Sequence, residues 1–225
     1  MKNADGSLRR KCSMILAVDI GNSNIVIGCV ENGKILFIER LSTRLLETDP
    51  EYAISFQSIL GLHDVNPRDI EGSIISSVVP SITNVIKSAI YKISGQNSMV
   101  VGPGIKTGLS IMTDNPAQLG SDLVVNAVAG IAEYPVPLLI LDLGTANTVS
   151  VIDKNKNYIG GMIYPGIGVS LDSLTARASQ LGGIGIEAPE HIIGKNTVEC
   201  MKSGIIYSSA AAIDGIIDRL QDELE

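Results

Sequence analysis

The chain has few of the residues that usually form metal sites, disulfides or aromatic binding surfaces. Among its 225 residues there is no tryptophan, and there are two phenylalanines, two histidines and three cysteines. Cys12, Cys29 and Cys200 are far apart and form no Cys-x-x-Cys pair. This spacing argues against a disulfide framework or a zinc site and favours a reducing, cytoplasmic environment. His63 and His191 are isolated, so we expect neither to be a metal ligand or a catalytic base.

Excess positive charge and long apolar runs are also missing. The net charge of −7 argues against non-specific binding to nucleic acid or to an anionic membrane, because both need a basic surface. No uninterrupted apolar run reaches the length of a transmembrane helix. Residues 1–13 are polar and basic and lack the apolar region of a signal peptide, so we expect a disordered extension or a start-site artefact. We therefore expect no nucleic-acid partner and no membrane partner.

The sequence does contain a duplicated hairpin pattern. An apolar run, a turn containing Asp, Gly and Asn, and a second apolar run occupy residues 15–28 and return at residues 138–149. The two copies align without gaps at an offset of 123 residues. The alignment pairs Leu16 with Leu139, Asp19 with Asp142, Gly21 with Gly144 and Asn24 with Asn147. An internal duplication of this kind predicts two related domains.

The turns have the chemistry of a phosphate site. Glycine lets the backbone approach a ligand closely, and successive N–H groups in such a turn can form an anion-binding concavity. Ser23 and Thr145 add hydroxyl donors. Asp19 and Asp142 would repel a phosphate, but their oxygens can hold a cation that neutralises it. One copy could equally be an ordinary hairpin, whereas two aligned copies favour a nucleotide clamp.

The pattern of apolar residues predicts an α/β fold. We expect two duplicated ribonuclease-H-like domains, residues 14–112 and 113–225, with mixed sheets and helices on both faces. For the first domain we predict strands 14–20, 24–30, 34–42, 73–79 and 98–101, a helix that Asp49 caps and Gly61 ends, a helix 81–94, and a loop 102–108. For the second we predict helix 115–133, strands 138–143, 147–153 and 157–163, helix 168–181, and a long helix from Asn196. By internal symmetry the second domain lacks at least one strand, so we expect it to be incomplete at its C-terminus, with an unpaired sheet edge.

Asp122 is the candidate catalytic residue on the predicted helix 115–133. It shares one helix face with Asn126, at a spacing of four residues. A carboxylate in an otherwise apolar helix is costly to bury unless it has a partner or a function. The alternative is an acidic residue near the N-terminus that interacts with the helix dipole. The residues alone do not decide between the two.

Five blocks of the sequence resemble type III pantothenate kinases, also called the Bvg accessory factor family, within the acetate and sugar kinase, Hsc70 and actin superfamily. The blocks are residues 19–26, 102–109, 114–122, 142–146 and 160–167. The resemblance extends from Met14 to about Glu225. It implies ATP-dependent phosphorylation of the primary hydroxyl of pantothenate, the first step of coenzyme A synthesis, by a cytoplasmic homodimer.

The resemblance also assigns residues to roles. The ATP-binding residues would be Asp19, Ile20, Gly21, Asn22, Ser23, Asn24, Ile25, Val26 and Thr145. Asp19 would face Mg²⁺ through the phosphates, and Asp142 would coordinate a monovalent cation, K⁺ or NH₄⁺. Asp122 would accept the proton from the attacking hydroxyl. Pantothenate would be contacted by Thr113, Gly120, Ser121, Asp122, Leu123 and Thr197.

Some positions depart from the family pattern, mostly on the acceptor side. Leu123 stands where the family has an arginine that would pair with the pantothenate carboxylate, and Thr113 stands where it has a tyrosine. Gly182-Gly183 replace a Pro-Arg pair, and Ser208-Ser209 replace a Gly-Tyr pair. Three hypotheses follow: a pantothenate kinase with a divergent pocket, a kinase for another small hydroxylated acceptor, or a nucleotide-binding regulatory paralogue without turnover.

Overall fold

The computed structural model describes residues 13–178 and 181–224, and these form two units. The first unit comprises the residues up to Gly108 together with Asp114–Val128, and the second comprises Leu109–Thr113 and Ala129–Glu225. The units interleave and do not divide at a single boundary between residues 112 and 113. The reason is that residues 110–111 pair with the second sheet, whereas the segment after them returns to the first unit. The predicted extension, residues 1–13, lies almost wholly outside the described residues.

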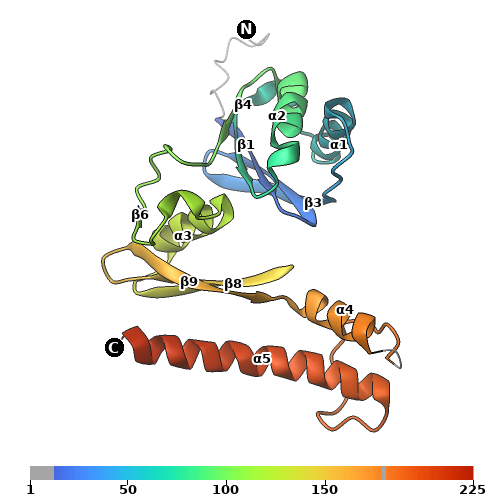
Figure 1. Cartoon of the computed structure of the whole chain (residues 1–225). Coiled ribbons are helices and arrows are strands. Elements are labelled where there is room, and N and C mark those ends of the chain that lie inside the picture. The colour runs from blue at the N-terminus through green and yellow to red at the C-terminus, as the bar shows by residue number, and fades with distance from the viewer. Residues whose placement is uncertain (1–12, 179–180, 225) are drawn as a thin grey trace. The chain divides into compact units, whose positions relative to one another are not determined.

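The first unit is a five-stranded mixed sheet in the order β3-β2-β1-β4-β5 (Figure 1). Its strands are β1 (Met14–Ile20), β2 (Asn24–Glu31), β3 (Lys34–Ser42), β4 (Ile70–Ser77) and β5 (Ser98–Val100). β1 pairs with β2 antiparallel and with β4 parallel, and β4 pairs with β5 parallel. The helices α1 (Asp49–Leu62) and α2 (Pro80–Ser94) provide the connections, as predicted for this ribonuclease-H-like order.

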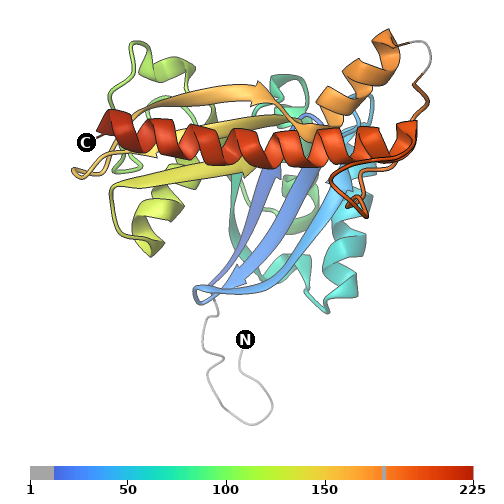
Figure 2. The same cartoon turned by 90° about the horizontal axis from the view of Figure 1, so that it is seen from below.

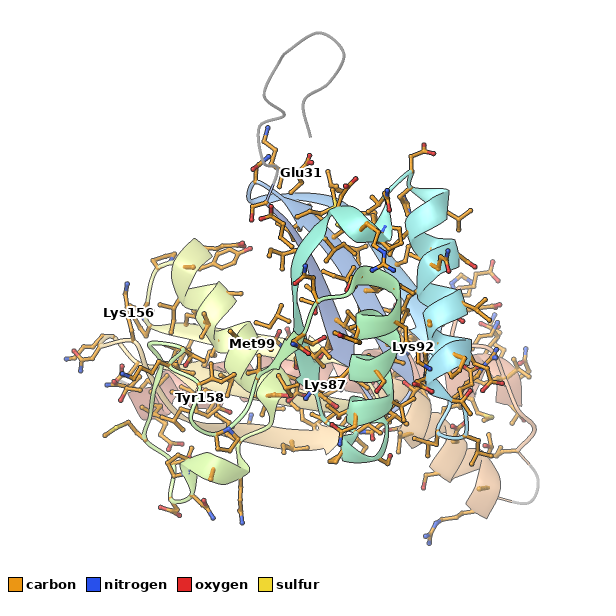
Figure 3. The ribbon with its side chains drawn as sticks, turned by 90° about the horizontal axis from the view of Figure 1, so that it is seen from above. Glu31, Lys87, Lys92, Met99, Lys156 and Tyr158 are labelled. Carbon is orange, nitrogen blue, oxygen red and sulfur yellow. The ribbon has the colours of Figure 1, made fainter. Side chains whose placement is uncertain are left out.

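The core of the first unit lies between the sheet and these two helices. Alternate residues of the strands point to opposite faces, so Leu16, Ile20 and Ile27 are fully buried while Asp19 is exposed. Tyr52 and Phe56 of α1 are fully buried on the same side. Lys92 of α2, labelled in Figure 3, joins the two helices at their surface: its Nζ forms an ion pair of 2.7 Å with Asp49 Oδ2 of α1.

Both ends of α1 differ from the prediction, since Gly61 lies inside the helix and the C-cap is His63. The N-cap is Thr48 and not Asp49, because Thr48 and Glu51 form a capping box. The Thr48 backbone N–H donates to Glu51 Oε2 at 2.7 Å, and this bond and one from the Thr48 side chain lower the pKa of Glu51. The end of α2 is as predicted, with Gly95 as a left-handed C-cap.

The second unit is a four-stranded sheet in the order β6-β9-β8-β7. Its elements are β6 (Ser110–Ile111), β7 (Leu138–Leu143), β8 (Ala146–Ile152), β9 (Asn157–Pro165), α4 (Ile167–Arg177) and α5 (Thr197–Leu224). α5 runs along one face of this sheet (Figure 2). Between β7 and the end of α5 there is a cavity of about 620 Å³, lined by residues that include Leu139 and Ile217.

The paired strands of the second sheet agree with the duplication. β7 has the place of β1, but it is an edge strand of the described sheet, whereas β1 is flanked by β2 and β4. Thus the described part of the chain has the unpaired edge that the internal symmetry predicts.

No helix among the described residues is long and apolar enough to cross a membrane.

Two helix predictions were wrong in their bounds. The predicted helix 115–133 is a 3₁₀ turn, η2 (Pro116–Gln118), followed by a separate helix, α3 (Ser121–Glu133). The predicted helix 168–181 ends at Arg177 in the structure, and residues 179–180 lie outside the described residues. Because of the first correction, Asp122 lies in the first turn of its helix and not inside it.

Candidate active site

The first Asp-Gly turn joins β1 to β2 and is held by backbone hydrogen bonds. The Gly21 N–H donates to the Asn24 carbonyl at 2.9 Å, which closes the turn. Thr43, just after β3, supports it from outside: its N–H donates to the Ser23 carbonyl at 3.0 Å, and its Oγ1 donates to the Gly21 carbonyl at 2.7 Å. Asp19 lies at the end of β1, on the exposed face. The turn is therefore a fixed loop that could bind a phosphate, beside a carboxylate that could hold the neutralising cation.

The end of β4 lies directly beside this turn. In the parallel pairing of β1 with β4, Asp19 is opposite Ser76 and Ile20 is opposite Ser77. The Val78 N–H continues the contact by donating to the Ile20 carbonyl at 3.0 Å. Because the carboxyl end of β4 is bonded to the turn, any group that β4 holds there lies close to the phosphate-binding candidates.

β4 holds the beginning of α3 at this position. The Ser121 hydroxyl accepts a hydrogen bond from the Ser77 N–H at 2.9 Å and donates to the Ser77 carbonyl at 3.0 Å. The Ser76 hydroxyl is 3.2 Å from the Ser121 hydroxyl. These contacts lie within the first unit, so its fold brings the predicted ATP-binding segment, residues 19–26, and the predicted acceptor segment, residues 120–123, to the same end of one sheet.

Asp122 is ordered by its immediate neighbours. Its Oδ1 accepts the Leu123 N–H at 2.9 Å. A Cβ atom at position 120 would lie 2.3 Å from the same oxygen, so the carboxylate occupies space that only a glycine leaves free. The position in the first turn is also compatible with the dipole interaction that the sequence left as the alternative. The nearby phosphate-type turn is the observation that favours a chemical role.

An apolar cavity of about 320 Å³ extends from this end along the first sheet. Asp19, Ser76 and Val125 of α3 are among its lining residues, which otherwise come mainly from β1, β2 and β3. Gly28 in the middle of β2 contributes no side chain to it. The lining residues at the far end are Val30, Ile35 and Ile38. The space beside Asp19 is thus largely apolar.

The second Asp-Gly turn is one residue tighter than the first, although the sequences align without a gap. In the first hairpin Asp19 pairs with Val26, whereas in the second Asp142 pairs with Thr148. A shift of one residue moves side chains to the other face of a strand. Asn147 is accordingly buried, whereas its sequence counterpart Asn24 is exposed. The two asparagines therefore do not have equivalent positions.

Gly166 supports the second turn from the end of β9. Its N–H donates to the Thr145 carbonyl at 3.0 Å. A Cβ atom at this position would lie 2.0 Å from the Gly144 oxygen and 2.7 Å from the Thr145 oxygen. The turn thus packs directly on the glycine backbone at the beginning of α4. Asp142 and Thr145 are exposed at this turn, as a ligand-binding role requires.

The two residues of the second unit that were predicted to contact the acceptor, Thr113 and Thr197, do not lie at its Asp-Gly turn. Thr113 follows β6, which pairs with the beginning of β9, whereas the turn meets the end of β9. The unit therefore does not bring Thr113 beside Asp142 and Thr145. Thr197 is the first residue of α5, whose start is capped by the Asn196 side chain accepting the Glu199 N–H at 3.0 Å.

The described residues contain no group of three or more His, Cys, Asp or Glu side chains that could hold a metal ion. Asp19 and Asp142 are single carboxylates at turns. A single carboxylate such as Asp19 fits a cation that takes most of its ligands from phosphate oxygens and water, which is the usual coordination of Mg²⁺. Neither Asp19 nor Asp142 belongs to a dedicated protein cage among the described residues.

Sequence reasoning missed two parts of the site. Thr43 supports the first turn from a position 22 residues later in the chain than Gly21. Ser76 and Ser77 hold α3 across a separation of 44 to 45 residues. The local sequence offers only the pair of serines at the end of an apolar strand. Serines are equally expected there in any solvent-exposed turn.

The fold is that of actin-like ATPases with two duplicated ribonuclease-H-like units. The activator of the 2-hydroxyisocaproyl-CoA dehydratase from Clostridium difficile with bound ADPNP matches at a TM-score of 0.53 and 14% identity, over 93% of this chain and 76% of that chain. A Baf family protein from Campylobacter jejuni matches at a TM-score of 0.52 and 18% identity, over 89% of this chain and 78% of that chain. At such identities the likeness concerns the fold alone.

The family follows from sequence relatives. The profile of the type III pantothenate kinase family matches residues 15–219. A type III pantothenate kinase from an Exiguobacterium species is 42% identical over 211 residues, which are 94% of this chain and 83% of the relative. One from Bacillus cytotoxicus is 43% identical over 210 residues, 93% of this chain and 80% of the relative. The chain belongs to the type III pantothenate kinase family.

Proposed function

We propose that this protein transfers the terminal phosphoryl group of ATP to the primary hydroxyl of pantothenate, the entry step to coenzyme A. The observation that carries the proposal is the position of Asp122, whose helix is hydrogen-bonded to the strand end that also holds the Asp19 turn. Phosphoryl transfer depends on positioning and charge neutralisation, and a carboxylate can accept the proton of the attacking hydroxyl. Membership of the kinase family supports the same reaction.

The proposed roles of the residues are those that the family resemblance implies, and the chemistry of the residues is compatible with them. Residues 19–26 and Thr145 bind ATP, with the first turn offering backbone N–H groups to the phosphates. Asp19 would face Mg²⁺ through those phosphates, and Asp142 would coordinate K⁺ or NH₄⁺. When bound, the divalent cation neutralises phosphate charge. Asp122 takes the hydroxyl proton, while Thr113, Gly120, Leu123 and Thr197 contact the acceptor.

A second candidate is a kinase for another small hydroxylated acceptor. Two observations favour it: Leu123 replaces the arginine that the family pattern has, and the cavity beside Asp19 is apolar. Loss of one partner of a buried charge pair costs about 2–5 kcal/mol. This corresponds to a roughly 30- to 4,000-fold loss of affinity for the pantothenate carboxylate if nothing compensates.

ADP release measured over a panel of acceptors distinguishes the two candidates. The panel contains pantothenate, its uncharged alcohol analogue pantothenol, and unrelated small alcohols, each up to millimolar concentration with ATP, Mg²⁺ and K⁺. Pantothenate-dependent release supports the first function, and release with a different acceptor alone supports the second. Nucleotide binding without release for any acceptor would contradict both and indicate a regulatory paralogue.

We also propose that the protein is a homodimer through its second unit. Apolar side chains of α4 and α5 are exposed there, among them Val169 (41%), Val198 (46%) and Tyr207 (43%). Burying such residues between two copies would remove apolar surface from water. We expect light scattering at micromolar concentration to give twice the mass of 23.7 kDa. A monomeric mass under these conditions would contradict the assembly.

A further inference from the structure

We propose that Ser121 is a positioning residue for catalysis: its hydroxyl fixes the first turn of α3 to the carboxyl end of β4 and thereby holds Asp122 in place. This inference rests on the proposed function of Asp122 as the proton acceptor. Ser121 was expected to touch the acceptor because of its place in the family pattern. The contacts of its hydroxyl indicate a different use.

The Ser121 hydroxyl has all of its hydrogen-bonding capacity engaged by β4. A serine hydroxyl has one donor and two acceptor positions. The donor goes to the Ser77 carbonyl at 3.0 Å, one acceptor position receives the Ser77 N–H at 2.9 Å, and the Ser76 hydroxyl at 3.2 Å is placed to use the other. The hydroxyl consequently has no capacity left for a substrate while the helix is in this position.

The Ser121 side chain bonds to backbone groups of β4 at a position that lies beyond the end of the neighbouring strand β5. The Val101 N–H donates to the Ile75 carbonyl at 2.8 Å, on the side of β4 where β5 lies. Backbone groups of a strand alternate in direction, so those of Ser77 point to the same side as those of Ile75. The Val78 N–H points the other way and donates to the Ile20 carbonyl of β1. Because β5 pairs no further than Ile75, the Ser77 N–H and carbonyl meet the Ser121 side chain instead of another strand.

The consequence is a short chain of bonds from the first turn to the carboxylate. Ile20 is bonded to Val78, Ser77 is bonded to Ser121, and Asp122 is the next residue. Gly120 on the other side leaves the space that the Asp122 carboxylate occupies. Within this series of bonds, the link between Ser77 and Ser121 is the one that a side chain makes. Removing the Ser121 hydroxyl breaks that link, so the beginning of α3 would lose its register with the turn.

The test compares Ser121→Ala with Ser121→Thr and with the control Ser73→Ala. Ser73 also lies in β4 and is buried, and its hydroxyl donates to the Ser98 hydroxyl at 2.8 Å, so its removal also breaks a buried hydroxyl bond on β4. Ser73 lies opposite Leu16 of β1, away from the Asp19 turn. We expect kcat of Ser121→Ala to fall by about 10- to 100-fold, because small misplacements of a reacting group have effects of this size. KM for ATP should change by less than about twofold, Ser121→Thr should recover most of kcat, and Ser73→Ala should keep the wild-type kcat.

A double-mutant cycle separates positioning from general damage. Because Ser121 acts through Asp122, adding Ser121→Ala to Asp122→Asn should lower kcat no further. Wild-type kcat in Ser121→Ala, equal losses in Ser121→Ala and Ser73→Ala, or additive losses in the double variant would overturn the inference. If the wild-type protein phosphorylates no acceptor, the proposed function fails, and with it the catalytic part of the inference. Hydrogen exchange then still tests the bond: Ser121→Ala, and not Ser73→Ala, should accelerate exchange of the Ser77 amide.

Discussion

Replacement of Gly166 by alanine should disable the second turn without removing any functional group. The added Cβ atom would lie 2.0 Å from the Gly144 oxygen, where ordinary van der Waals contact begins at 3.4 Å. The oxygen belongs to the backbone, so the turn that carries Thr145 must move by more than 1 Å, the difference between these distances. Overpacking of this kind costs about 1–3 kcal/mol of stability. A displacement of about 1 Å can cost about 100-fold in rate.

Gly168→Ala is the matched control. Gly168 lies two residues further along in α4, and a Cβ atom there meets nothing within 4 Å. Alanine within a helix is favoured over glycine by about 0.5–1 kcal/mol, so this variant should be slightly more stable than the wild type.

Titration with a fluorescent ATP analogue and thermal unfolding compare the two variants. We expect Gly166→Ala to bind the ATP analogue at least about tenfold more weakly, a smaller effect than the 100-fold that such a displacement can have on rate. Gly168→Ala should bind it as the wild type does. Equal nucleotide affinity in Gly166→Ala and the wild type, with a folded second unit, would refute the assignment of this turn to ATP.

Three further predictions concern the first turn of α3 and the pH dependence. Gly120→Ala should displace the Asp122 carboxylate, which is 2.3 Å from the new Cβ atom, and lower kcat without unfolding, whereas Gly102→Ala, which meets nothing within 4 Å, should be neutral in the same assay. Asp122→Asn should lower turnover by about 100- to 10,000-fold and leave ATP affinity nearly unchanged; an active variant would remove Asp122 from its role. Hydrogen bonds from Asn157 and Asn155 lower the pKa of Asp153, so its stabilising contribution is present at neutral pH and is lost as the pH falls through the folded-state pKa. The difference in unfolding temperature between the wild type and Asp153→Asn should therefore shrink below about pH 4, and a difference that does not depend on pH would contradict this.

Local patterns were sufficient to predict the first sheet and both hairpins. Strands β1 and β3 have the predicted bounds, because alternating or continuous apolar residues and strong turn residues define them within a few positions. The helix break at residues 119–120 was missed, since Asn115-Pro116 does begin a helical turn and the apolar pattern continues across Gly120. β6 was missed because two residues form a strand only through pairing with β9.

The sequence proposes a set of candidate site residues but does not predict how they are arranged. The Asp19 turn and Asp122 were identified from motif chemistry and resemblance. The unequal registers of the two hairpins could not be seen, because the gapless alignment pairs Asn24 with Asn147 while the backbone does not. The bonds of Ser121 to β4 could not be seen either, because they depend on where β5 ends. In both cases the information lies in strand pairing and not in nearby sequence.

Detection of the product itself tests the central claim most directly. The wild-type protein and Asp122→Asn would be incubated with ATP, Mg²⁺, K⁺ and pantothenate, and the mixture analysed by mass spectrometry for phosphorylated pantothenate. We predict that the wild type forms the phosphate ester on the primary hydroxyl and that Asp122→Asn, with unimpaired nucleotide binding, forms almost none. An unchanged pantothenate pool with a folded, ATP-binding wild-type protein would contradict the account.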